Sequence, residues 1–431
     1  MNLPFFIILI SVLYILQNVV ETKTLNQLIK RRGGIITVIK KTNKKKGGKK
    51  PKPKSTTKRK STTKRKTTSK KSTTSKTSQK PGSYKSPYYI NQTTIKYYLD
   101  DKLVQKFYNL INQQTTNINT LTCLKIERQT DPNDKKDIDI GYCSENWVKL
   151  STKKGTPTKV CLKEDITAKE LVFHFGYALG LVPEITRKDS SLYVKVFKNN
   201  ISPKTDYEKY YKVQKYSSKI IANSSFDYYS MMLSSQYFKS RKNDKRTYRF
   251  ETNLGKYYEK SANISEFFTY NDLKRLWYLY CDKKCKSLEC KNYGYPENNC
   301  ESCRCPSPFS GKKCEIPFPE FKECGNTQKF IANSSKSFYT IENINLDCNY
   351  LIKSKNNKKV QFIVENLYMP HESDCDFYYG SIVKYREDRG AEGLFLCGNY
   401  TKISFPPLTS EIYLTIIGTG KNSLNFSIQE K

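Results

Sequence analysis

The sequence predicts a multidomain protein, with an α+β domain followed by a small disulfide-rich module and an all-β module. Three observations predict this order. Strand and helix periodicities alternate in the first part of the folded region. Seven Cys then lie within the 34 residues from Cys281 to Cys314. After Cys324, short apolar runs are separated by Gly, Asn and Pro, which is typical of β-strands and turns.

The start of the chain is strongly apolar. Residues 1–16 contain hardly any polar side chain, which predicts a secretory signal peptide over residues 1–21, with an uncleaved membrane anchor as the alternative. Fourteen Cys and seven Asn-x-Ser/Thr sequons fit an oxidising, extracellular environment. The sequons are at Asn91, Asn200, Asn223, Asn263, Asn333, Asn399 and Asn425. We therefore expect a secreted glycoprotein without stable membrane insertion once the signal peptide is removed.

A basic low-complexity segment follows over residues 22–86. Its part from 30 to 85 contains 23 Lys or Arg and no Asp or Glu, so it carries +23 of the formal net charge of +36. The six residues 55–60 are repeated directly as residues 61–66. Such a composition cannot bury enough apolar surface to order the chain, so we expect disorder. The segment is either a solvated linker or a tail that binds sulfated glycans or other polyanions.

The α+β domain, expected over residues 87–282, contains two clear helical patterns. Residues 95–99 and 122–126 have strand character, and Asp100 and Asp101 stand where a helix would begin. Apolar residues then recur at helical spacing, at Leu103, Val104, Phe107, Leu110 and Ile111. The second helix is predicted over residues 167–181, with Leu171, Val172, Phe175, Ala178 and Leu179 on one face. Strands of the all-β module are expected at 362–364, 381–383 and 412–417.

The second helix contains an altered zinc-binding motif. Residues 173–184 have the frame of the H-E-x-x-H-x-x-G-x-x-H zinc helix, in which three His hold the metal. The three ligand positions hold Phe173, Tyr177 and Pro183, and the position of the Glu base holds His174; the Gly is kept as Gly180. The whole chain contains two His. A three-His zinc site is therefore excluded within one chain.

From about residue 93 onward, the chain resembles the astacin family of secreted zinc endopeptidases, followed by EGF-like and CUB modules. The segments that carry this resemblance are residues 122–126, 141–144 with Cys161, 177–181, and 226–232 with Met232 at the Met-turn position. The residues that match the segment after the zinc helix are Glu184, Arg187, Asp189, Tyr193 and Val194. The resemblance implies a metzincin fold for 87–282, an EGF-like module over 283–316 and a CUB sandwich over 324–431.

The resemblance also implies a pairing for every Cys. The implied disulfides are Cys123–Cys281, Cys143–Cys161, Cys285–Cys300, Cys290–Cys303, Cys305–Cys314, Cys324–Cys348 and Cys375–Cys397. Each bridge would stabilise the fold by about 2–4 kcal/mol. The frame can therefore hold without a metal.

The departures from the family concern its chemistry, in which zinc polarises the scissile carbonyl and the Glu acts as base. Phe173 and Pro183 offer no donor atom, and the Tyr177 phenol, with an ordinary pKa of about 10, is a poor ligand. The Tyr that follows the family's Met-turn is replaced by Ser234. The family's pro-segment blocks its zinc with an Asp, but no Asp precedes Asp100 in this sequence. We therefore expect no catalytic residue, no metal site and no cofactor, although the family uses zinc.

Two further sites have alternative interpretations. His174 is either a surviving catalytic base or a structural His with a backbone partner, and we favour the second because no metal or carboxylate accompanies it. Glu365 and Asp376 are candidate calcium ligands in the CUB module. The position where the remaining acidic ligand is expected holds Tyr378, so we do not expect a complete site.

Three functions follow from these observations. The first is a non-catalytic pseudoprotease that binds an extracellular protein or peptide in a groove lined by Phe173, His174 and Tyr177. The second is a zinc metalloendopeptidase, by family membership. The third is a polyanion-binding protein that acts through residues 30–85.

Overall fold

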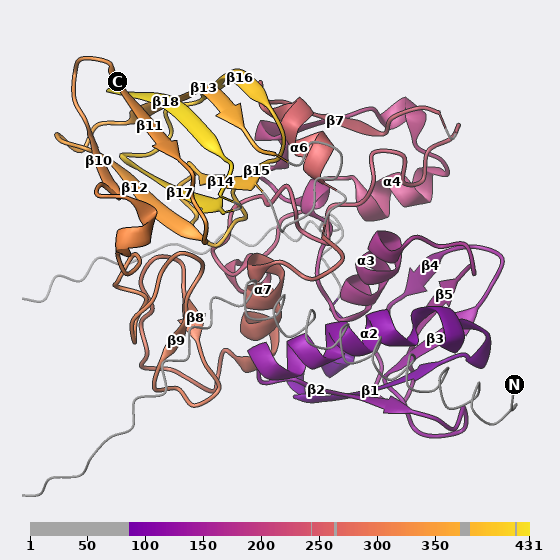
Figure 1. The fold of residues 1–431 in the computed structure, drawn as a ribbon. Coiled ribbons are helices and arrows are strands. Elements are labelled where there is room, and N and C mark those ends of the chain that lie inside the picture. Colours follow the sequence, from indigo (N-terminus) through magenta and orange to yellow (C-terminus); the bar gives the residue numbers. More distant parts are fainter. Residues whose placement is uncertain (1–85, 243, 263–264, 371–379, 419) are drawn as a thin grey trace, which may run out of the picture. The chain divides into compact units, whose positions relative to one another are not determined.

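The structure, a computed structural model, describes residues 86–242, 244–262, 265–370, 380–418 and 420–431 (Figure 1). The expected signal peptide and the basic segment to residue 85 lie outside the described residues. So do Asn263, His371, Cys375, Asp376, Tyr378 and the side chain of Asn91. The described residues belong to one compact unit. No helix in the described part is long and apolar enough to cross a membrane.

The α+β domain is built on a five-stranded sheet in the order β2-β1-β3-β5-β4. The strands are β1 (Thr94–Leu99), β2 (Lys125–Gln129), β3 (Ile138–Tyr142), β4 (Trp147–Lys149) and β5 (Thr158–Leu162). The first four in this order pair in parallel, whereas β4 pairs antiparallel with β5. One side of β4 is therefore a free edge of the sheet.

Two helices cover the sheet (Figure 1): α2 (Asp101–Leu121) packs on β1, β2 and β3, and α3 (Ala168–Ala178) packs on β4 and β5. The predicted start of α2 is confirmed, because the Asp100 side chain accepts a hydrogen bond from the Lys102 N–H. The strand predicted from residue 122 begins too early. Thr122 ends α2, because its N–H donates to Ile118 O, and β2 begins at Lys125.

The second half of the domain has short elements. Its strands are β6 (Val194–Val196) and β7 (Tyr248–Phe250), which pair antiparallel. Its α-helices are α4 (Lys204–Tyr210), α5 (Ser218–Ile221), α6 (Gly255–Ser261) and α7 (Tyr270–Cys281). Its short 3-10 helices are η2 (Glu184–Thr186), η3 (Ser190–Leu192) and η4 (Lys198–Asn200), whereas another, η1 (Tyr88–Asn91), precedes β1. The Cys123–Cys281 disulfide joins the end of α7 to the chain just before β2, and Cys143–Cys161 is also formed.

The described residues of the disulfide-rich module form one small ladder of strands, β8 (Tyr295–Pro296) paired with β9 (Cys303–Arg304), and an isolated bridge between Ser310 and Ile316. Three disulfides hold it, at Cys285–Cys300, Cys290–Cys303 and Cys305–Cys314. These are the pairs that the resemblance implies. So small a segment needs cross-links because it buries little apolar surface of its own. A short helix, η5 (Lys322–Cys324), leads into the next module.

The C-terminal module is the expected all-β sandwich of two sheets, ordered β10-β12-β17-β14-β15 and β11-β18-β13-β16. Its strands are β10 (Lys329–Ala332), β11 (Ser337–Glu342), β12 (Cys348–Ser354), β13 (Val360–Tyr368), β14 (Gly380–Lys384), β15 (Leu394–Leu396), β16 (Tyr400–Phe405), β17 (Glu411–Ile417) and β18 (Ser423–Glu430). The three predicted strand segments lie within β13, β14 and β17. Alternate residues of β13, such as Val360, Phe362 and Val364, are buried between the sheets. Cys324–Cys348 is formed.

Residues between β14 and β15 contact the α+β domain. The Asp388 carboxylate accepts hydrogen bonds from the Ser225 N–H at 2.7 Å and from the Asn271 amide at 3.0 Å. The Arg386 guanidinium lies 4.7 Å from the Tyr193 ring centroid and donates to the Ser225 hydroxyl. Both charged side chains are buried, so these contacts are well shielded from solvent.

Candidate functional site

The altered motif lies on α3, a helix buried on nearly all sides. A Cβ atom placed on Gly176 would come within 2.7 Å of Met232 Sδ and 2.8 Å of Phe268 Cε1. Only Gly therefore lets α3 approach the Met232 turn this closely. Gly180 then takes a φ of +92° after the end of α3, and the Glu184 N–H donates to Met232 O at 2.9 Å. The segment around Pro183 and Glu184 is thus held beside Met232.

Phe173, at the first ligand position, is part of the hydrophobic core. Its side chain is 1% exposed, and its ring lies 5.2 Å from that of Phe238 and 5.9 Å from that of Tyr210. The expectation that Phe173 and His174 line a groove is therefore wrong. Tyr210 of α4 and Phe238 occupy the space next to Phe173 on this face of α3.

His174, at the position of the catalytic base, is 0% exposed. Its Nδ1 lies 2.7 Å from Glu170 O, a carbonyl that can only accept, so Nδ1 carries the proton and donates it. Nε2 has no hydrogen-bond partner among the described residues. Burial lowers the pKa of His174 to about 4, so the ring stays neutral at physiological pH. His174 thus has the backbone partner that its interpretation as a structural His requires.

The remaining ligand positions do not fit zinc either. Burial raises the pKa of Tyr177 to about 12, which keeps its phenol protonated, and Pro183 has no donor atom. Zinc sites need imidazole, thiolate or carboxylate ligands in a tetrahedral arrangement. In the described ranges, no three His, Cys, Asp or Glu side chains converge on one point. The residues at this place therefore do not fit the metal of the motif.

A buried ionic network lies behind the motif. Glu184 is fully buried; one carboxylate oxygen pairs with Arg275 Nη1, and the other lies 3.5 Å from Arg187 Nε. Arg187 also pairs with Asp189, at 2.8 Å. Burial raises the pKa of Glu184, and the two guanidinium groups oppose that shift. The residues retained after the motif therefore shape the chain through charge pairing.

Asp272 holds the Met232 turn. Its carboxylate accepts hydrogen bonds from the Ser230 hydroxyl at 2.6 Å and from the Met231 N–H at 2.9 Å, and it forms a capping box with Thr269. Neither Asp272 nor Arg275 was expected from the sequence. The Thr269-x-x-Asp272 spacing is a capping-box signal that could have drawn attention to Asp272. Arg275 has no comparable local signal, because it meets Glu184 only across 91 residues of chain.

The other candidate residues are placed as follows. Ser234 is buried, and its main-chain carbonyl accepts a hydrogen bond from Tyr248 at 2.6 Å. Glu365 is engaged by Lys336 at 2.8 Å and by Ser427 at 2.6 Å, and its suggested calcium-binding companion lies outside the described residues. Of the sequons, Asn223 and Asn399 are exposed, Asn333 is half-buried, and Asn200 and Asn425 make side-chain hydrogen bonds. Their glycosylation stays a prediction.

Comparisons with known proteins agree with the motif frame. Residues 83–281 match the family model described as Astacin, a peptidase family. The zinc metalloproteinase nas-34 of Caenorhabditis elegans is 29% identical over 280 residues, which cover 63% of this chain and 44% of that protein. The zinc metalloproteinase dpy-31 of Brugia malayi is 26% identical over 282 residues, covering 63% and 45%. The chain thus spans less than half the length of these relatives.

Two solved structures are also similar. High choriolytic enzyme 1, a hatching enzyme zinc-protease from Oryzias latipes, matches at 19% identity with a TM-score of 0.34, covering 43% of this chain and 88% of that chain. The CUB1-EGF-CUB2 domain of human MASP-1/3 matches at 15% identity with a TM-score of 0.20, covering 34% and 57%. The sequence matches, together with the α3, Gly180 and Met232 arrangement, lead to one conclusion: residues 83–281 of this chain are a domain of the astacin family.

Proposed function

We propose that this chain is a secreted pseudoprotease, an astacin-family protein that has lost its zinc chemistry and acts by binding extracellular proteins or peptides. We further propose that the disulfide-rich module is EGF-like and that the sandwich is a CUB module. The disulfide pairs and the two-sheet arrangement support these assignments.

One observation carries the proposal. The first ligand position and the base position are both occupied by side chains buried in the core, Phe173 and His174. A metalloendopeptidase needs at least three protein ligands and an open coordination position for water. Here Phe173 has no donor atom, and His174 gives its one N–H to its own helix. The place of the metal has become part of the packing.

The same burial limits where a partner can bind. Side chains that are 0–1% exposed cannot contact a ligand, so Phe173 and His174 take no part in recognition. We therefore place the binding function on the outer surfaces of the domain and of the two C-terminal modules.

The zinc content tests the proposal. The purified secreted protein is dialysed against a buffer that contains zinc, and unbound zinc is then removed. We expect elemental analysis to find far less than one zinc per chain. We also expect no chelator-sensitive hydrolysis of casein or of a peptide library, with an active astacin-family peptidase as the positive control. Stoichiometric zinc together with hydrolysis that a chelator abolishes would contradict the proposal.

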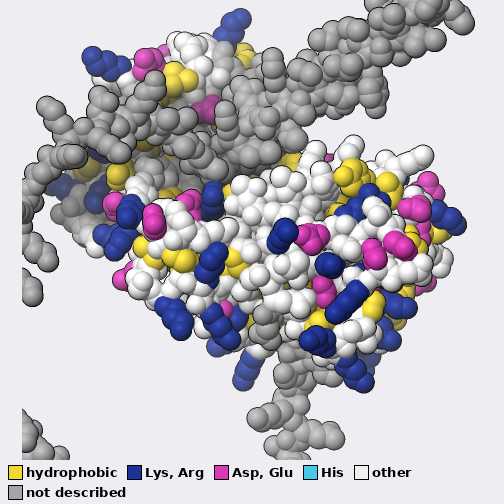
Figure 2. Space-filling view, turned by 90° about the horizontal axis from the view of Figure 1, so that it is seen from below, with side chains coloured by type: hydrophobic (Ala, Val, Ile, Leu, Met, Phe, Trp, Pro, Cys, Tyr) yellow, Lys and Arg dark blue, Asp and Glu magenta, His cyan; other side chains and the backbone are white. Residues whose placement is uncertain are grey.

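A second candidate function, polyanion binding, is favoured by the 23 positive charges within residues 30–85. By contrast with residues 30–85, the face of the described residues in Figure 2 carries both basic side chains, Lys and Arg, and acidic ones, Asp and Glu. We expect the full-length protein to elute from heparin at high salt, with steep salt dependence, because each neutralised anion releases a counterion. A variant lacking residues 30–85 should elute at much lower salt. Equal elution of the two proteins would rule out this role for the segment.

A further inference from the structure

No strand pairs with the outer edge of β4 among the described residues, but side chains from the second half of the domain contact this edge. In the antiparallel pairing with β5, Val148 stands opposite Val160. In such a strand, successive residues direct their backbone groups to opposite sides, so residues two apart face the same side. The carbonyls of Asn146 and Val148 are two residues apart, and both accept hydrogen bonds from lysines outside the sheet. These two carbonyls therefore face the free edge.

Each of the two carbonyls receives one lysine. Lys239 Nζ donates to Asn146 O at 2.9 Å, and Lys209 Nζ donates to Val148 O at 2.5 Å. Lys209 belongs to α4, whereas Lys239 directly follows Phe238, which packs on Phe173. Both lysines thus connect the second half of the domain to the edge of the sheet.

Contacts around the two ammonium groups hold them in place. Lys239 Nζ lies 3.6 Å from an Asp206 carboxylate oxygen, and its side chain is 21% exposed. Lys209 Nζ lies 4.7 Å from the Tyr210 ring centroid and 5.2 Å from that of Tyr177. Burial lowers the pKa of Lys209 to about 8, so the charged form still predominates at neutral pH. A partly buried ammonium group keeps its charge where it makes strong hydrogen bonds.

We propose that Lys209 and Lys239 are a latch that closes the β4 edge against the addition of a further strand. An added strand pairs by donating N–H groups to alternate carbonyls of an exposed edge. Here both of those carbonyls are already bonded within the chain. The lysine latch thus covers the edge of the sheet, and Phe173 and Tyr210 pack against each other next to it. This inference does not depend on whether the protein hydrolyses peptides.

The double substitution Lys209→Met/Lys239→Met tests the latch, because Met keeps most of the aliphatic stem and removes the donors. We expect hydrogen–deuterium exchange in peptides covering 143–150 and 204–212 to become about tenfold faster, as local opening becomes easier. The matched control is Lys204→Met/Lys242→Met, two exposed lysines of the same half of the domain. We expect exchange in this control to equal that of the unaltered protein.

The freed edge should also promote pairing between copies of the chain. We expect the Met pair to self-associate with increasing concentration in sedimentation velocity, while the control pair does not. Unchanged exchange in the Met pair, or an equal rise in the control, would overturn the latch. Fast exchange without self-association would overturn its role against strand addition. If the Met pair fails to fold, Lys239→Met alone should give a smaller rise in exchange, and unchanged exchange in that variant would also overturn the latch.

Discussion

Replacing Phe173 with Ala is expected to destabilise the protein by about 3–5 kcal/mol, the usual cost of emptying a well-packed aromatic site. The side chain is fully surrounded, with the rings of Tyr210, Phe238 and His174 at 5.9, 5.2 and 5.6 Å from its ring centroid. Such a loss would show that the former ligand position is now core. The measurement is the urea midpoint together with the slope of the unfolding transition, which reveals any change in cooperativity.

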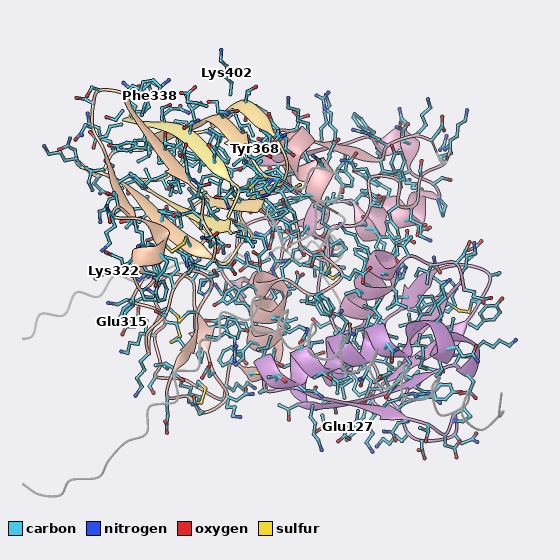
Figure 3. The ribbon with its side chains drawn as sticks, in the orientation of Figure 1. Glu127, Glu315, Lys322, Phe338, Tyr368 and Lys402 are labelled. Atoms are coloured by element: carbon cyan, nitrogen blue, oxygen red, sulfur yellow. A yellow bond between two sulfur atoms is a disulfide. The ribbon has the colours of Figure 1, made fainter. Side chains whose placement is uncertain are left out.

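Phe338→Ala is the matched control, since it makes the same substitution at a Phe that is 67% exposed on the sandwich (Figure 3). We expect that variant to lose less than about 0.5 kcal/mol. If Phe173→Ala were as mild as the control, the site in front of α3 would be an open cleft. The interpretation of that site as packed core would then fail.

Replacing Arg275 with Met is also expected to cost about 3–5 kcal/mol, because it leaves the Glu184 carboxylate buried with only a weaker partner. Arg275 is 1% exposed and contacts both Glu184 and Asp272. The second charge matters because Asp272 holds the Met232 turn. We expect a fall in the urea midpoint and increased susceptibility of the α+β domain to limited proteolysis.

Arg249→Met provides the control, because Arg249 makes an exposed ion pair with Glu251 at 2.7 Å. Exposed pairs contribute little, so we expect a change below about 1 kcal/mol. Adding Glu184→Gln to Arg275→Met should recover part of the loss, since it removes the unpaired buried charge. An Arg275→Met variant as stable as Arg249→Met would contradict a structural role for the network.

The first prediction concerns Phe173, at a ligand position of the family motif, and the second concerns Arg275, which pairs with Glu184, the residue after another ligand position. Phe173 is packed, His174 is bonded to its own helix, and Glu184 is paired with Arg275. The retained Gly180 takes a φ of +92° where the chain leaves α3, and Gly176 lets α3 approach the Met232 turn. The fold is therefore preserved by packing and charge pairing, in a place where the motif family uses zinc.

Local sequence patterns were sufficient to predict several helices and strands of this protein. Helical spacing and the Asp100 cap predict α2, and short apolar runs between Gly, Asn and Pro predict β13, β14 and β17, because these signals depend only on neighbouring residues. The replaced ligand positions were also evident, since Phe and Pro lack donor atoms in any fold. The start of β2 was missed because Thr122 makes a hydrogen bond to the preceding helix turn instead of joining the strand.

Other features depend on contacts between distant segments, which no local pattern reports. The burial of Phe173 and His174 comes from Tyr210 and Phe238, which follow them by dozens of residues. The Arg275–Glu184 pair and the lysines on the β4 edge join segments 61 to 93 residues apart. The sequence alone therefore identified the lost zinc ligands. Only the tertiary structure decided that the space is filled and its edge closed, because long-range packing places those side chains.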